Sequence, residues 1–407
     1  MSKIKICRIC KSKEIIKILD LGKQPLANHI LNKVDEKAKT FPLDIFLCKK
    51  CYGLQLGYNV PPNKMFSDYS YATANTKPLC EHFKNMTKFL QKKFKLKKND
   101  VVIDIGCNDG TLLSYYNKNI IKVGIDPSNV SKKSQNKFNL INKFFDHRIA
   151  SVYLKKFKKA KIITATNVFA HVNEHKRFLK GVHDILDDNG VFIIEVPYVD
   201  DMIKSKNFDT IYHEHVFYFS VHSINFLLNK FNFEIFDIQR FTFGPSGPPL
   251  RFFCRKIREH RKNNKTLNKY LNREKKERIN KIATYFKFKK DVENHKIKLK
   301  NILKEISKNN KIVGIGAPAK ANTILNYLKI SNKELECILE TNKLKFNKFT
   351  PITKIQIKKE TSNILRRYKY AFLLSWNIKD YFLKKTSFVK NHKGKVIIPF
   401  PEPKILG

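Results

Sequence analysis

The chain has 407 residues, enough for two to four domains, and carries 81 Lys and Arg against 35 Asp and Glu, a net charge of +46. An apolar content of 42% supports buried cores and excludes a disordered chain, and no apolar run reaches the length of a membrane span. The N-terminus lacks the apolar core of a signal peptide, so we expect a cytoplasmic protein with no membrane partner.

The positive charge has several explanations. Lysines are spread along the whole chain and do not alternate with aromatic residues in one patch. Surface positions that have drifted to lysine therefore explain the charge better than a nucleic-acid partner, which we do not expect. A positive field would also attract a nucleotide-linked substrate.

Two CxxC pairs stand near the N-terminus, and we predict that they bind zinc. In a reducing compartment such pairs favour a metal over a disulfide, and neither pair follows a strand in a thioredoxin-like context. Four thiolates form a closed tetrahedral shell around Zn²⁺, which implies a structural role. The predicted zinc-binding domain covers residues 1–66, with the ligands Cys7, Cys10, Cys48 and Cys51.

Strands and helices then alternate between residues 67 and 256, and this order predicts a parallel sheet covered on both faces. Strands are expected at 101–106, 121–126, 160–169 and 190–198, with a weaker one at 138–145, a helix at 174–187, and closing strands at 233–241 and 248–256.

The last part of the chain, residues 257–407, begins with a basic helical pattern that predicts a long helix or helix pair bridging two domains. A second α/β pattern follows at 311–328, 335–340, 370–376 and 394–400.

The first central strand ends in a glycine loop, "VVIDIGCNDGTLL". Glycines let the backbone approach a ligand closely, and an acid at the end of the second strand can hold ribose hydroxyls. The loop lacks the GxGxxG of a dinucleotide site and resembles the S-adenosylmethionine (SAM) loop of class I methyltransferases; an ordinary strand–helix turn is the alternative. The predicted SAM-binding residues are Asp104, Gly106, Asn108, Gly110, Asp126, Asn167 and Phe169.

The stretch "IYHEHVFYFS", residues 211–220, concentrates titratable groups after the fifth strand. Histidine is a common general base, a carboxylate can orient it, and a tyrosine hydroxyl can donate to an oxyanion. These groups suit removal of a proton alpha to a ketone, which gives an enolate able to take a methyl group from SAM. A hydrogen-bonded polar turn is the alternative. In an extended segment, alternation would place His213 on the same side as His215.

Several stretches together resemble the C-methyltransferases that act on nucleotide-linked 4-keto deoxysugars. The resemblance covers nearly the whole chain and implies an N-terminal zinc-binding domain, a class I SAM-methyltransferase central domain and a C-terminal Rossmann-like α/β domain. The matching stretches are "CRIC", "CKKCYGLQL", "YSYATANT", "DIGCNDGTLL", "FAHVNE", "YHEHVFYFS", "VGIGAPAKANTILNY" and "IIPFPEP".

The same resemblance implies roles for individual residues. His215 would be the base. Glu214 and Tyr212 would support it and line the sugar site, with Glu214 orienting the ring, and His171 and Tyr71 would face the same pocket.

In the C-terminal domain, Gly314, Gly316 and Lys320 match a loop of the family, where Lys320 would orient the substrate; a purely structural turn is equally open. Arg251 of "GPSGPPLRF" matches a second substrate position. The implied substrate is a keto deoxysugar linked to a nucleotide such as dTDP, for deoxysugar or surface-polysaccharide biosynthesis, and we expect a monomer. The alternatives are a zinc-ribbon RNA methyltransferase, for which the fourth strand lacks an Asn-Pro-Pro-aromatic motif, a sugar O-methyltransferase, and a scaffold without activity.

Overall fold

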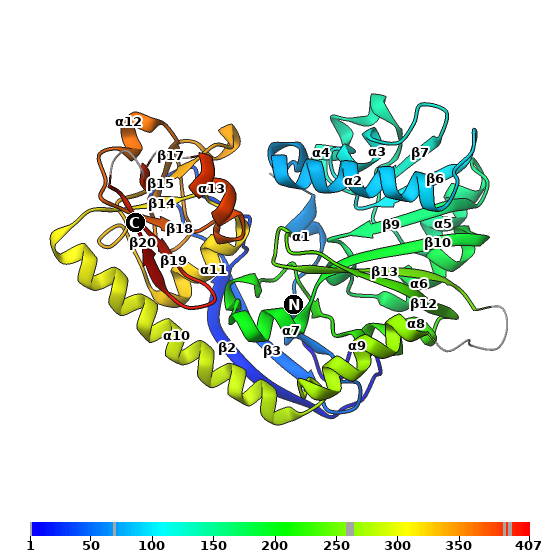
Figure 1. The fold of residues 1–407 in the computed structure, drawn as a ribbon, viewed down its shortest axis with the longest axis horizontal. Coiled ribbons are helices and arrows are strands. Elements are labelled where there is room, and N and C mark those ends of the chain that lie inside the picture. The colour runs from blue at the N-terminus through cyan, green and yellow to red at the C-terminus, as the bar shows by residue number, and fades with distance from the viewer. Residues whose placement is uncertain (1, 68–70, 258–263, 386–387, 390–392) are drawn as a thin grey trace.

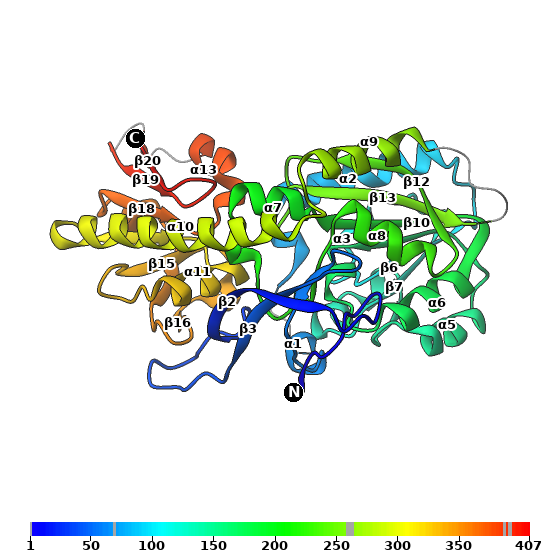
Figure 2. The ribbon, with the colours of Figure 1, turned by 90° about the horizontal axis from the view of Figure 1, so that it is seen from below.

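The structure is a computed structural model that describes residues 2–67, 71–257, 264–385, 388–389 and 393–407. It has two lobes that are joined at their base (Figure 1). Strands β2 (Ile15–Pro25) and β3 (Thr40–Cys48) lie between the lobes at this base, and helix α10 (Ile282–Asn309) runs along the C-terminal lobe (Figure 2). No helix in the described ranges combines the length and the apolar character needed to cross a bilayer.

The central lobe is built on a seven-stranded sheet in the order β12-β13-β10-β9-β6-β7-β8. Strands β6 to β10 are parallel, and β13 pairs antiparallel with both β10 and β12. Every predicted central strand is confirmed. The inner strands, such as β6 and β9, are mostly apolar and buried on both faces, which makes them stand out in the sequence. The bounds are β6 (Val101–Ile105), β7 (Ile121–Ile125), β8 (Asn139–Ile141), β9 (Ala160–Thr166), β10 (Leu186–Pro197), β12 (Phe233–Arg240) and β13 (Pro249–Lys256).

Helices cover both faces of this sheet (Figure 1). The predicted helix at 174–187 is α6, which ends at Ile185 because β10 begins at the next residue. The longer helices are α2 (Lys77–Lys93), α5 (His147–Leu154), α6 (His175–Ile185), α7 (Val199–Ser205) and α8 (Val221–Asn229), and the short elements are α1 (Asn63–Phe66), η1 (Thr73–Asn75), α3 (Thr111–Ser114), α4 (Asn129–Lys132), η2 (Gln135–Lys137), η3 (Phe169–His171) and η4 (Phe208–Thr210).

The N-terminal domain contains a sheet whose fourth strand comes from the central part of the chain. Its order is β11-β4-β3-β2, with β4 at Leu54–Leu56 and β11 at Phe217–Tyr218, and a separate pair joins β1 (Ser2–Lys3) to β5 (Tyr58–Asn59). Phe217 pairs with Gln55, and Tyr218 pairs with Leu54. The 211–220 segment is therefore anchored in the N-terminal domain.

The C-terminal lobe holds a second seven-stranded sheet, in the order β16-β17-β15-β14-β18-β19-β20. Its five inner strands are parallel, and the two edge strands are antiparallel to their neighbours. The predicted second α/β unit is confirmed. Its elements are β14 (Ile312–Ile315), α11 (Ala319–Leu328), β15 (Cys337–Glu340), η5 (Lys343–Lys345), β16 (Lys348–Phe349), β17 (Gln356–Lys359), α12 (Ser362–Leu365), β18 (Tyr370–Leu373), η6 (Trp376–Ile378), α13 (Lys379–Lys385), β19 (Lys395–Ile398) and β20 (Lys404–Leu406).

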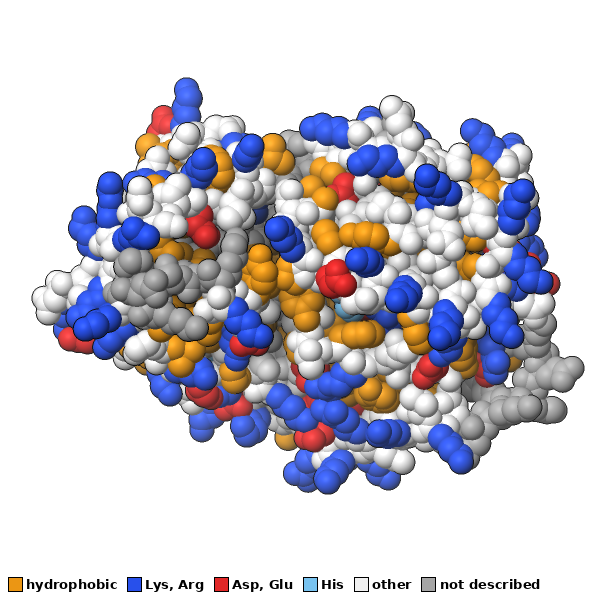
Figure 3. Space-filling model, turned by 45° about the horizontal axis from the view of Figure 1, so that its top comes forward, with side chains coloured by type: hydrophobic (Ala, Val, Ile, Leu, Met, Phe, Trp, Pro, Cys, Tyr) orange, Lys and Arg blue, Asp and Glu red, His pale blue; other side chains and the backbone are white. Residues whose placement is uncertain are grey.

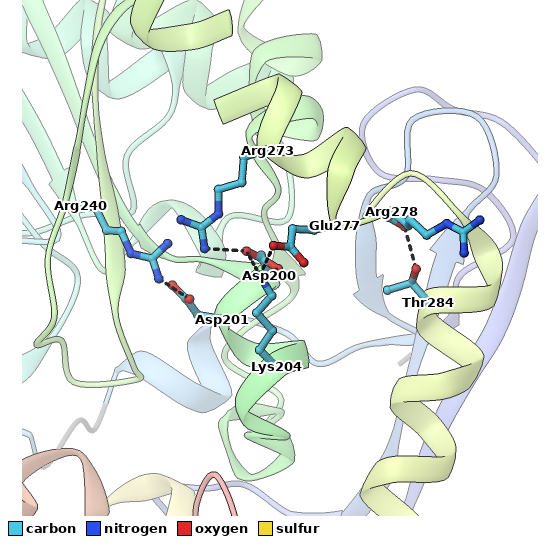
Figure 4. A network of polar contacts seen from close by, with 8 residues as sticks. All are labelled: Asp200, Asp201, Lys204, Arg240, Arg273, Glu277, Arg278 and Thr284. Carbon is cyan, nitrogen blue, oxygen red and sulfur yellow. Dashed lines mark hydrogen bonds and ion pairs between the residues drawn. The ribbon is translucent and has the colours of Figure 1, made fainter. Parts of the chain in front are cut away.

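A helix pair links the two lobes, as predicted: α9 (Lys265–Lys276) and α10. Figure 4 shows how α9 is fixed to α7, which precedes the 211–220 segment. Asp200 of α7 accepts from Arg273 at 3.1 Å, and Lys204 reaches Glu277 at 2.9 Å. Since α9 also packs on α8 and β12, it belongs physically to the central lobe. The domain boundaries drawn from the sequence stay predictions.

Candidate active site

The loop after β6 forms one wall of a large cavity. Gly106 has φ 75°, and a Cβ there would lie 2.2 Å from Cγ2 of Val168, so this position requires glycine. The backbone N–H of Asn108 donates to Oδ2 of Asp126 at 2.9 Å, and the N–H of Ser128 donates to Oδ1 at 2.8 Å. The Asp126 carboxylate is thereby fixed at the cavity wall, and each oxygen keeps a lone pair for a ligand hydroxyl.

The side chain of Asn108 holds the segment that contains Tyr71. Its Oδ1 accepts from the Thr73 N–H at 2.9 Å, and its Nδ2 donates to the Tyr71 carbonyl at 3.0 Å. Tyr71 lines the cavity, and burial raises the pKa of its hydroxyl to about 12, so the group stays protonated and can donate. Asn108 thus shapes the cavity through the backbone it binds.

Two more of the predicted cofactor residues, Asp104 and Asn167, line the cavity. Asp104 is buried and accepts a 2.7 Å hydrogen bond from Oγ1 of Thr164, and burial raises the pKa of its carboxyl to about 7. The other two predicted cofactor residues, Phe169 and Gly110, do not line the cavity. Phe169 is fully buried and stacks on Phe219 at 5.3 Å, so its contribution is to packing.

His215 lies in a tight turn, in which its N–H donates to the carbonyl of Tyr212 at 2.9 Å. Its Nδ1 lies 2.8 Å from the carbonyl oxygen of Thr210. A carbonyl can only accept, so Nδ1 carries the proton and Nε2 carries a lone pair. The hydroxyl of Tyr212 lies 2.9 Å from Nε2 and donates to it. The ring is thereby held in one orientation and one tautomer.

His171 completes this corner of the cavity. Its ring lies 5.0 Å from that of His215 and stacks on Phe66 at 5.5 Å. Burial lowers the pKa of His171 well below its usual value and lowers that of His215 to about 4. Both imidazoles are therefore neutral near pH 7. His171, Tyr212 and His215 all line the cavity, so the structure brings together three of the predicted groups.

Two expectations about this turn need correction. The group that orients His215 is the carbonyl of Thr210, whereas Oε1 of Glu214 accepts a 2.7 Å hydrogen bond from Asn28. His213 does not share a side with His215, because the segment is a turn and alternation does not apply. The Nε2 of His213 lies 3.3 Å from the carbonyl of Pro42, on the N-terminal sheet.

The C-terminal lobe supplies the opposite wall of the cavity. Lys320 of α11 is buried there, with its Nζ 4.0 Å from the centre of the Trp376 ring and hydrogen-bonded to Asn377. Burial lowers the pKa of Lys320 to about 8, with Asp209 as the carboxylate that opposes the shift. Gly316 also lines this wall, whereas Gly314 lies within β14.

Arg251 does not line the cavity, contrary to the expectation that it contacts the substrate. Its side chain is 2% exposed and pairs with Glu195 at 2.7 Å. His82 of α2 lies 2.8 Å from the same carboxylate. This buried group joins α2, β10 and β13, so it fixes the sheet behind the cavity.

The cavity has a volume of about 1230 Å³ and is lined by residues of all three domains. Single small-molecule sites commonly measure about 300–1,000 Å³, so this one has room for two ligands. The two lobes meet along a hollow in Figure 3, where Lys and Arg side chains are spread over both lobes.

The four cysteines of the CxxC pairs meet as predicted. Their sulfur atoms all lie within 4.8 Å of one another, with Cys7 and Cys51 3.5 Å apart and Cys10 and Cys48 3.4 Å apart. Tetrahedral Zn–S bonds of about 2.3 Å place sulfurs about 3.8 Å apart, so the set fits a zinc ion. None of the four lines the cavity, and the cysteines Cys7, Cys48 and Cys51 pack in the same core as Phe217. A zinc ion held by these four thiolates would have no open coordination position, which suits a structural role.

Sequence reasoning missed several cavity residues. Glu340 is the last residue of β15 and Asp126 directly follows β7, and this parallel between the two α/β units was a usable signal. Phe144 follows β8 and lines the cavity, with 42% of its surface exposed. Asn28 could not be singled out from the sequence because it lies in an irregular loop after β2. Lys345 could not be singled out because it is one of many lysines in the chain.

Three family models match successive parts of the chain. Family models match residues 7–66 ("Putative zinc binding domain"), 75–238 ("Methyltransferase domain") and 246–401 ("C-methyltransferase C-terminal domain"). The fold and site define a SAM-dependent methyltransferase of class I with an N-terminal zinc-binding domain. The C-methyltransferase NovU from Streptomyces niveus is 25% identical over 406 residues, which cover 98% of this chain and 96% of that protein. Along nearly its whole length the chain is therefore similar to C-methyltransferases that combine a zinc-binding domain, a methyltransferase domain and a C-terminal domain.

Two solved structures were also found to be similar. A SAM-dependent methyltransferase from Anabaena variabilis is 16% identical and covers 43% of this chain and 93% of its own, with a TM-score of 0.33. Magnesium protoporphyrin IX methyltransferase from Synechocystis, with bound SAH, is 14% identical and covers 43% and 81%, also with a TM-score of 0.33.

Proposed function

We propose that this C-methyltransferase methylates a carbon next to the ketone of a nucleotide-linked 4-keto deoxysugar, with His215 as the general base. The observation that carries the proposal is the lone pair on Nε2 of His215, fixed by the Thr210 carbonyl and placed beside the Tyr212 hydroxyl in a cavity that also contains the SAM loop. A positioned base and an adjacent hydroxyl donor are the two groups that enolate formation needs.

The hydrogen bond between the two residues suggests how the base is released. When the ketone oxygen of the substrate accepts from Tyr212, that hydroxyl stops donating to His215, and the Nε2 lone pair becomes available for the alpha proton. The Thr210 carbonyl then stabilises the imidazolium through Nδ1. A developing enolate beside the ring favours the charged imidazole and so opposes the effect of burial on its pKa. SAM supplies the methyl group when it is bound.

The C-terminal wall suits the nucleotide end of such a substrate. The N-terminus of α11 faces the cavity, and two buried lysines, Lys320 and Lys345, also line it. Backbone N–H groups at a helix N-terminus and lysine cations both favour a diphosphate. Glu340 lies at the end of β15, where an acid can accept from ribose hydroxyls.

The match to a C-methyltransferase domain favours carbon over oxygen as the methyl acceptor, and it also counts against an RNA substrate. A role in deoxysugar or surface-polysaccharide biosynthesis in the cytoplasm, by a monomeric enzyme, is part of the same proposal.

The direct test is incubation of the protein with SAM and a panel of dTDP-linked 4-keto-6-deoxysugars, followed by mass spectrometry and proton NMR of the products. The proposal expects one added methyl group whose NMR signal shows a bond to carbon. An O-methyl product, or no product from any sugar of the panel, would contradict it.

A further inference from the structure

Asn28, in the loop after β2, brings the N-terminal domain into the cavity. It lines the cavity, and its Nδ2 donates to Oε1 of Glu214 at 2.7 Å. Within the described ranges its side chain makes no other hydrogen bond. An amide has two N–H donors and one carbonyl acceptor, so one donor and the acceptor remain for a ligand.

The loop around Asn28 is held by the C-terminal lobe on both sides. Nδ2 of Asn322, on α11, donates to the carbonyls of Ala27 at 2.6 Å and His29 at 3.4 Å. Leu31 and Phe349 exchange two backbone hydrogen bonds of 2.8 Å each. Because the backbone is fixed on both flanks, little ordering is needed when a ligand binds Asn28.

Glu214 holds the Asn28 side chain by a hydrogen bond from outside the cavity. Its side chain is 3% exposed and is not part of the cavity lining, although it directly precedes His215. A hydrogen bond to a carboxylate is stronger than one between neutral groups, so it fixes the plane of the Asn28 amide.

We propose that Asn28 binds a hydroxyl group of the substrate's sugar and that Glu214 is a positioning residue that orients Asn28. A hydroxyl both donates and accepts, which matches the N–H and carbonyl that Asn28 has left, whereas a ketone can only accept. The contact with Glu214 places Asn28 next to the turn that holds Tyr212 and His215, and hence at the sugar end of the substrate. This inference rests on the proposed function.

The test compares two ligands by calorimetry in the absence of SAM: dTDP-4-keto-6-deoxyglucose, and dTDP, which lacks the sugar. Asn28→Ala should weaken binding of the keto sugar by about threefold to tenfold, the range for loss of a hydrogen bond, and leave dTDP binding unchanged. Asn32→Ala removes an exposed amide from the same loop and should change neither affinity. Glu214→Gln should weaken keto-sugar binding, and adding it to Asn28→Ala should cause little further loss.

A merely structural contact would give a different result. In that case Asn28→Ala would lower the melting temperature and weaken both ligands together, or change neither affinity, and either outcome overturns the inference. Additive losses in the double variant would overturn the positioning role of Glu214. If the wild-type protein binds dTDP but not the keto sugar, or binds neither ligand, the proposed function fails and the inference fails with it; normal binding by Asn28→Ala overturns the inference alone.

Discussion

The hydroxyl of Tyr212 lies 2.9 Å from Nε2 of His215 and donates to it, because Nδ1 of the same ring is committed to the carbonyl of Thr210. Tyr212 therefore has two roles in the proposed reaction. Its hydroxyl orients the His215 ring before the substrate binds, and it donates to the enolate oxygen afterwards.

Tyr212→Phe should therefore lower kcat while the affinity for SAM stays the same. Loss of one donor to a developing oxyanion costs about 10²–10³ in kcat. Steady-state kinetics with the keto sugar, together with SAM calorimetry, measure both quantities. Wild-type kcat in this variant would remove Tyr212 from the mechanism.

Asp126→Ala should weaken SAM binding by roughly tenfold to a hundredfold, since hydrogen bonds to a charged carboxylate contribute about 1.5–3 kcal/mol. The carboxylate is buried at the cavity wall and held by two backbone N–H groups. Calorimetry with SAM is the measurement, and Asp35→Ala, an exposed site on the N-terminal domain, is the control. Equal SAM affinity in Asp126→Ala and wild type would mean that the ribose binds elsewhere.

Zinc removal should increase the mobility of residues 211–220, which include His215, without preventing SAM binding. Cys7, Cys48 and Cys51 pack in one core with Phe217, and β11 pairs with β4, the strand that follows the second CxxC pair. We expect about one zinc per chain, a lower melting temperature after chelation, and faster hydrogen exchange at residues 211–220 than in the SAM loop.

Elemental analysis, calorimetry and hydrogen-exchange mass spectrometry give these values. Protein that was never exposed to chelator and contains far less than one zinc would contradict the metal assignment. Unchanged hydrogen exchange at residues 211–220 after chelation would contradict the claim that the zinc site stabilises this segment.

Acidification should destabilise the protein in a definite pH range. Burial lowers the pKa of His213 and of His215 to about 4, below the value of about 6.5 in an unfolded chain. Between these values the unfolded state binds more protons, so stability is present above about pH 6.5 and is lost as the pH falls toward 4. Each such group contributes up to about 1.4 kcal/mol per pH unit.

The melting temperature measured from pH 7.5 to pH 5 tests this claim. His213→Gln should flatten the decline, whereas His29→Gln, at an exposed position, should not. Parallel curves for both variants would show that His213 does not titrate as described.

The sequence predicted the parts of the fold that depend on apolar pattern and spacing. Buried strands such as β6 and β9 are mostly apolar, and the CxxC spacing predicted that the four cysteine sulfurs lie together. It could not predict the partner of His215, because the carbonyl of Thr210 has no residue-specific signature. The pairing of β11 with β4 could not be predicted from the sequence either, since it joins residues about 160 positions apart.

The role of His215 as the general base is tested most directly by exchange of the alpha proton of the keto sugar in deuterated water, with a SAM analogue that cannot transfer a methyl group. We expect deuterium at the alpha carbon with wild-type protein, and a loss of exchange by about 10²–10⁴-fold in His215→Asn, the usual contribution of a general base. SAM affinity should be the same in both, which shows that the variant is folded. Wild-type exchange that persists undiminished in His215→Asn would contradict the assignment of His215 as the base.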